Sequence, residues 1–201
     1  PTTIANIADQ YFVVDRTGYT PPVGTDSVSV QIRLLKTEVF TTGLIPGLTE
    51  LAPLDLDGSL VAPRNYFNLA IRAPRIVYRT WDVDSLNVRA YAGDTAALFV
   101  VTTPLVKRGE KDFVENAVFN GRFLANTANV SFKASNDEGR ERFLLELEAL
   151  MNKKTRETVV TLSPRQVIDF QEWAVHQDNL ISIKSGNIDI QHLILTGNGQ
   201  S

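Results

Sequence analysis

The chain has 201 residues, of which 43% are hydrophobic and 21% are charged, and it contains no cysteine. This length is enough for one domain with a sizeable core, which we place over residues 1–201. The absence of cysteine excludes disulfides and thiolate chemistry, and the formal charge of −3 does not suit a nucleic-acid binder. We therefore expect no nucleic-acid partner, and we expect neither a cofactor nor a bound metal.

The first ten residues, PTTIANIADQ, lack the charged and apolar segments of a signal peptide. We therefore expect synthesis in the cytoplasm, which is compatible with incorporation into a virion. The chain has no apolar run of about 18 residues, so no membrane partner is expected. Residues 1–26 are predicted to form an N-terminal arm with a strand at Gln10–Asp15.

Residues Ser27–Leu34 alternate between polar and apolar side chains. Val28, Val30 and Ile32 share one side, and this period of two predicts a half-buried strand. The apolar positions change parity after Leu34, which predicts a β-bulge near residues 34–36.

Residues 43–65 combine three prolines and three glycines with many apolar side chains. The prolines and glycines predict a long irregular loop. A solvated loop would not carry so many apolar groups, so we expect it to pack on its own sheet or on a neighbouring subunit. The residues predicted to make this contact are Leu44, Ile45, Leu48, Leu51, Leu54, Leu56 and Leu60.

Within this loop, Asp55-Leu56-Asp57-Gly58-Ser59-Leu60 resembles the D-x-D-G-T-L motif of haloacid-dehalogenase-type phosphatases, with Ser59 in place of threonine. The resemblance implies a phosphatase in which Asp55 attacks phosphorus and Asp57 acts as acid and base, with a magnesium ion. That family needs an apolar strand before the first aspartate and alternating strands and helices, and neither is predicted here. We therefore interpret the segment first as a turn.

Four further strands are predicted, at Tyr66–Arg72, Arg75–Thr80, Leu86–Tyr91 and Ala96–Thr102. Residues 97–101 are apolar without alternation, which is typical of a central strand covered on both faces.

Arginine is the only basic residue type between positions 64 and 89. Arginine pairs well with carboxylates and phosphates and is enriched at interfaces. Three interpretations are open for Arg72, Arg75 and Arg79: a belt of ion pairs between subunits, a phosphate-contacting patch, or a solvated sheet face.

Asp82 and Asp84 alternate on a predicted strand and should share a face. Two such carboxylates could serve a glycosidase. Trp81, with Tyr78 and Tyr91, could instead form a platform for a sugar.

Two hairpins are predicted later in the chain, one at Asn120-Gly121 and one at Ser185-Gly186. Both pairs tolerate the positive φ angles of tight hairpin turns. Strands are also predicted at Val130–Ala134 and Glu157–Leu162.

Two helices are predicted against this β background. Residues 136–153 follow a capping-box pattern, Ser135 to Glu138, and carry apolar residues at helical spacing. Residues 164–177 start with Pro164, which is favoured at the first helical position. His176 and His192 lack an adjacent nucleophile and are interpreted as structural.

The sequence thus predicts a mainly β, antiparallel sandwich or barrel with two helices packed on it. For function we expect a non-enzymatic assembly subunit of a homo- or hetero-oligomer. Viral coat, decoration and tail-connector proteins have this general character, by analogy of fold alone. The alternatives are a β-sandwich module that binds carbohydrate or another polar ligand, and a hydrolase using paired aspartates.

Overall fold

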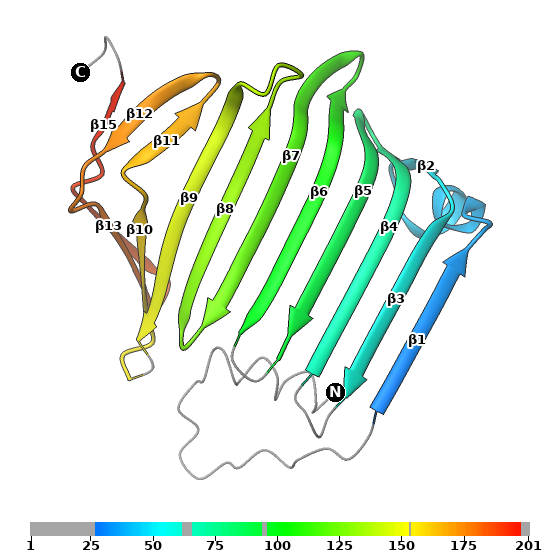
Figure 1. Cartoon of the computed structure of the whole chain (residues 1–201), viewed down its shortest axis with the longest axis horizontal. Helices are drawn as coiled ribbons and strands as arrows, with labels where there is room; N and C mark the ends of the chain where they lie inside the picture. Colours follow the sequence, from blue (N-terminus) through cyan, green and yellow to red (C-terminus); the bar gives the residue numbers. More distant parts are fainter. Residues whose placement is uncertain (1–26, 62–65, 94–95, 153, 198–201) are drawn as a thin grey trace.

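The protein forms one wide, open antiparallel sheet (Figure 1). This computed structural model describes residues 27–61, 66–93, 96–152 and 154–197. The predicted arm 1–26, with its strand at Gln10–Asp15, lies outside the described residues. Extensive contacts between elements join only strands that pair in the sheet, or β2 with a short helical turn, η1 (Phe40–Leu44). The described strands therefore build a single layer and not the sandwich or barrel that we predicted.

The long strands follow one another through the sheet almost in chain order. The spatial order is β1 (Ser27–Leu34), β3 (Leu54–Val61), β4 (Tyr66–Tyr78), β5 (Trp81–Ala92), β6 (Ala97–Arg108), β7 (Lys111–Leu124), β8 (Thr127–Ser135), β9 (Glu141–Asn152), β10 (Glu157–Leu162), β13 (Leu180–Lys184) and β14 (Asn187–Gln191). Off this path, β2 (Leu48–Leu51) pairs with β4, β11 (Arg165–Ile168) pairs with β9 and β12 (Gln171–Val175), and β15 (Leu195–Gly197) pairs with β12.

The two predicted helices are wrong. Residues 136–153 contain a turn followed by strand β9, and residues 164–177 contain the hairpin β11–β12. Asp169 and Phe170 form the turn of that hairpin with φ angles of 49° and 66°. The helical spacing of apolar residues in β9 was misleading because Leu144 and Leu150 face one side of the sheet while Phe143 and Leu147 face the other.

The predicted loop 43–65 and one predicted hairpin are also corrected. Pro46 and Pro53 lie outside strands. β2 lies between these two prolines and β3 follows Pro53, so the Asp55–Leu60 segment is a strand and not a turn. Asn120-Gly121 lies inside β7, and the turn to β8 is made by Ala125 and Asn126, both with positive φ. The hairpin at Ser185-Gly186 and the strand Glu157–Leu162 are confirmed.

The strand Ser27–Leu34 is confirmed, although its side chains are mostly exposed and not half-buried. The β-bulge predicted near residues 34–36 is absent from this part of the described chain, because β1 ends at Leu34. Real interruptions lie elsewhere. The ladder is interrupted at the same level in four neighbouring strands, β4 to β7, at Pro74, Ser85, Pro104 and Asn116. The β5–β6 ladder also skips Leu86 and Thr103 at this level.

Because of these interruptions, β4 to β7 keep apolar side chains on the same side of the sheet before and after this level. Ser85 and Asn116 have positive φ angles, and Pro74 and Pro104 have no N–H to donate. The parity of each strand changes by one residue there, so Ile76, Val83, Val106 and Val114 return to the apolar side. Thr103, almost buried at this level, donates its hydroxyl to the carbonyls of Asp84 and Leu105.

The sheet forks beyond β9, where β10 and β11 pair with different parts of that strand. At this fork, side-chain amides make hydrogen bonds to backbone groups that a neighbouring strand would otherwise bind. Gln166, 2% exposed, accepts from the Glu146 N–H at 2.9 Å and donates to the carbonyls of Glu146 and Ser163. Asn179, 3% exposed, makes equivalent bonds to both backbone groups of Leu162. These two amides fix the C-terminal branch of the sheet.

Candidate interaction surface

One side of the sheet is apolar from β1 to β9. The ladder places four alternate residues of each strand on this side, within a stretch of about seven residues. We call this surface the apolar face. Its larger side chains are Val28, Val30, Ile32, Leu34, Leu54, Leu56, Leu60, Phe67, Leu69, Ile71, Leu86, Val88, Phe99, Val101, Phe119, Phe123, Val130, Phe132, Phe143, Leu145 and Leu147.

No described element covers this face. Among the described residues, no large side chain is fully buried, and the most buried positions of β4 to β8 are small residues such as Ala73, Ala92 and Ala134. Phe119 in β7 and Leu145 in β9, both on this face, remain 40% and 41% exposed. A folded chain of this length normally encloses larger apolar side chains, so the apolar face has the character of half of a core.

The centre of the apolar face is flattened by a glycine. Gly121 has no side chain, and a Cβ built there would lie 2.2 Å from the ring of Phe99. The Phe99 ring therefore lies across β7, with centroids 5.0 Å from Phe119 and 6.0 Å from Phe123. This packing of an aromatic ring over a strand glycine gives β6 and β7 a broad aromatic surface.

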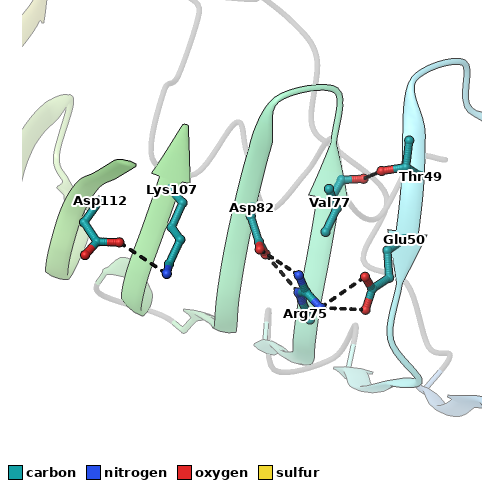
Figure 2. A network of polar contacts seen from close by, with 7 residues as sticks. All are labelled: Thr49, Glu50, Arg75, Val77, Asp82, Lys107 and Asp112. Carbon is teal, nitrogen blue, oxygen red and sulfur yellow. Dashed lines mark hydrogen bonds and ion pairs between the residues drawn. The ribbon is translucent and has the colours of Figure 1, made fainter. Parts of the chain in front are cut away.

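The opposite side of the sheet, the polar face, carries ion pairs. Figure 2 shows Arg75 of β4 between Glu50 of β2 and Asp82 of β5. Its guanidinium binds both oxygens of Asp82, at 3.1 and 2.8 Å, and approaches Glu50 at 3.2 Å. The hydrogen bond to Arg75 lowers the pKa of Asp82. Lys107 and Asp112 make a further pair at 3.4 Å on β6 and β7 (Figure 2).

A similar cluster of ion pairs links the polar face of β8 and β9 to the strands at the fork. Glu141 of β9 binds Lys133 of β8 and Arg165 of β11, each at 2.8 Å. Both partners lower the pKa of Glu141, with Lys133 the larger cause. Arg165 also binds Glu172 of β12 at 2.8 Å. These pairs are largely exposed and neutralise one another, so they leave no concentrated charge for a ligand.

The edges of the sheet form a further exposed surface. Within the described chain, β1 pairs only with β3, and β14 pairs only with β13. Ile188 and Ile190 of β14 are 65% and 56% exposed. Neither edge strand contains lysine or proline, the residues that commonly prevent edge pairing.

The structure places the predicted interface leucines in two groups. Leu54, Leu56 and Leu60 lie on the apolar face in β3, and Leu51 of β2 pairs with Ile76 on the same side. Leu48 is buried beside Tyr78. Leu44 and Ile45, at the end of η1, are exposed.

The predicted arginines do not form one belt. Arg72 lies on the polar face, opposite Asp55 and Asn87 in the ladder. Arg75 is held in the network of Figure 2. Arg79 lies in the β4–β5 turn with a φ of 54°, and its guanidinium stacks over Tyr78 at 5.3 Å, so it does not continue the strand as predicted.

Asp82, Asp84 and Asp55 each contact a neighbouring side chain. Asp82 and Asp84 share the polar face, as predicted, but Asp82 is bound by Arg75 and Asp84 accepts from the Ser85 hydroxyl. Asp55 binds Arg33 at 2.7 Å. The described part of the chain holds no group of three or more histidine or acidic side chains suited to a metal ion.

The predicted sugar platform is partly occupied by protein groups. Trp81 packs edge-on against Phe113 at 5.1 Å, and Arg108 lies over its ring at 5.4 Å. Tyr91 packs edge-on against Tyr66. His192, interpreted from the sequence as structural, is exposed with a φ of 50°, and its ring lies 6.2 Å from that of His176.

Sequence reasoning missed the apolar face, although several strands, such as β1, β3 and β4, alternate between apolar and polar residues. The residues 97–101 illustrate the error. Leu98 and Val100 project from the polar face and are exposed, so this central strand is not covered on both sides. In the described residues, no helix has the length and apolar character needed to cross a membrane.

No family model, curated protein or solved structure matches this chain. The surfaces described above therefore provide the grounds for any functional inference.

Proposed function

We propose that this protein is a non-enzymatic assembly subunit, which works by associating with other protein chains in a larger oligomer. The observation that carries the proposal is the apolar face, which extends over eight neighbouring strands and which no element of the described residues covers. Water contact with so much apolar area costs free energy, at roughly 25 cal/mol per Å², and association recovers that energy.

The two edge strands support the same proposal. Within the described residues, each of these strands has a neighbouring strand on one side only. Their outer backbone groups, and the exposed Ile188 and Ile190 of β14, can therefore add strands from other chains. On the polar face, Arg75 and Arg165 are paired with carboxylates of neighbouring strands, so these two guanidinium groups are already engaged within the chain.

Light scattering on the purified chain tests the proposal. We expect a mass that is a multiple of 22.3 kDa, or a monomer that binds an apolar dye strongly because its partner chain is missing. A strict monomer that leaves the dye unbound would contradict the proposal, because the apolar face would then be covered within one chain.

A further inference from the structure

We propose that the apolar face of one copy packs against the apolar face of a second copy, so that two open sheets form a two-layered sandwich. This inference rests on the proposed function and specifies its partner and its surface. The sandwich predicted from the sequence is then formed between chains and not within one.

The size of the apolar face suits such a pairing. Eight strands, β1 and β3 to β9, lie side by side. With strands about 4.8 Å apart and about seven residues rising about 3.3 Å each, the face covers about 900 Å². A stable protein–protein interface buries about 800 Å² on each partner, so the face is large enough for a dimer without additional contacts.

The chemistry of the face suits a copy of itself. Across these eight strands the ladder places no charged side chain on the apolar face within the seven-residue stretches, and Thr103 is its one polar side chain. Thr103 already donates within its own chain. A two-fold pairing therefore brings no like charges together and buries no unpaired polar group.

The shape of the face also favours sheet-on-sheet packing. Two sheets pack about 10 Å apart when their side chains interdigitate without tall projections. Because Gly121 lets the Phe99 ring lie across β7, the middle of the face offers flat aromatic rings and short aliphatic side chains. Phe132 and Phe143, with centroids 6.2 Å apart, extend this surface towards β9.

Thiol labelling tests the inference, because the chain has no cysteine of its own. Leu145 on the apolar face and Leu98 on the polar face are each 41% exposed in a single chain, so they form a matched pair. We expect the thiol of Leu145→Cys to react roughly tenfold more slowly than that of Leu98→Cys with a water-soluble alkylating reagent in the oligomer. Dilution to the monomer should equalise the two rates.

A second pair, Phe119→Cys and Val100→Cys, provides the same comparison at 40% and 39% exposure if a leucine variant fails to fold. An oligomer with equal rates would overturn the inference and leave the proposed function standing, with the edges as the contact. A chain that stays monomeric without dilution and shows equal rates overturns the inference, and the dye assay then decides the proposed function separately.

Two other results would assign a different occupant and also overturn the inference. Slow labelling of Leu145→Cys in a monomer would mean that the chain covers its own apolar face. Protection that appears only after phosphatidylcholine vesicles are added would mean that lipid, and not a second copy, occupies the face.

Discussion

The meander β3 to β9 and the C-terminal branch β10 to β15 differ in the side chains that they bury. In the meander, strands are long, and the most buried side chains are mainly alanines. In the branch, strands are short, yet Gln166, Val167, Val175 and Asn179 are each at most 5% exposed. The branch encloses these side chains, although the buried indole N–H of Trp173 in β12 has no hydrogen-bond partner among the described residues. In the described part of the chain, the meander leaves its apolar side uncovered.

This difference indicates where stability comes from in each region. The branch depends on amide hydrogen bonds to backbone groups, which are costly to leave unmade when buried. The meander depends on its hydrogen-bond ladder and, in our proposal, on a second layer. Substitutions should therefore act on folding in the branch and on association in the meander.

The largest effect is expected from Gln166→Ala. This change leaves the backbone groups of Glu146 and the carbonyl of Ser163 without their buried partner, and we expect a loss of about 3 kcal/mol in the free energy of unfolding. Urea denaturation measures it. The exposed Gln177→Ala is the control, and equal losses in both variants would show that the amide does not fix the branch.

An intermediate effect is expected at Gly121. A methyl group there meets the Phe99 ring, so Gly121→Ala should cost about 2 kcal/mol by overpacking and should weaken self-association as the ring tilts outward. Gly58 also lies on the apolar face, but a Cβ at this position has its nearest neighbours at 3.8 Å. Gly58→Ala should therefore be neutral or slightly stabilising. Urea denaturation compares the free energies of unfolding of the two variants, and light scattering compares their self-association. Identical values for both variants would contradict the claim that Gly121 flattens the apolar face.

The smallest effect is expected at Glu141. Its pKa is lowered in the folded state from the usual 4.5, so its contribution to stability is present above that pH and is lost as the pH falls through the lower, folded-state value. Glu141→Gln should lower stability at neutral pH by less than about 1 kcal/mol and flatten the acid branch of the stability curve. Asp82→Asn provides the corresponding measurement in the meander. If Glu141→Gln left the pH dependence of the free energy of unfolding unchanged, the contribution of the Glu141 carboxylate to that dependence would be refuted.

The β class and most strands were predictable because alternation is a local property. Ser27–Leu34 and Glu157–Leu162 have the predicted bounds, and the Ser185-Gly186 hairpin is present with φ angles of 51° and 82°. The predicted break between Arg72 and Arg75 corresponds to the interruption at Pro74 within one strand.

The helices and the Asn-Gly turn were mispredicted because each local pattern is compatible with more than one structure. In β9, apolar residues on both faces reproduced a helical spacing. At Asn120-Gly121 the glycine serves a packing role, since it receives the ring of Phe99 from the neighbouring strand. That contact joins residues more than twenty positions apart, which a turn rule does not consider.

The candidate surface was only partly predictable. The sequence analysis singled out the leucines of β3 as interface candidates, and the structure places them on the apolar face. Their interpretation as an irregular loop hid their alternation, which matches that of Phe67, Leu69 and Ile71 across the ladder. Only the register shows that seven further strands continue the same surface.

The nearly sequential order of strands has a consequence for how the chain reaches its native state. From β4 to β10, each strand pairs with the one synthesised immediately before it, mostly through turns of a few residues. Such neighbour-to-neighbour pairing lowers the loop-closure entropy of every step, so the sheet can grow one hairpin at a time from a growing edge. Chain elongation and sheet growth then run in the same direction, and a nascent chain can acquire its registers before its C-terminal branch exists.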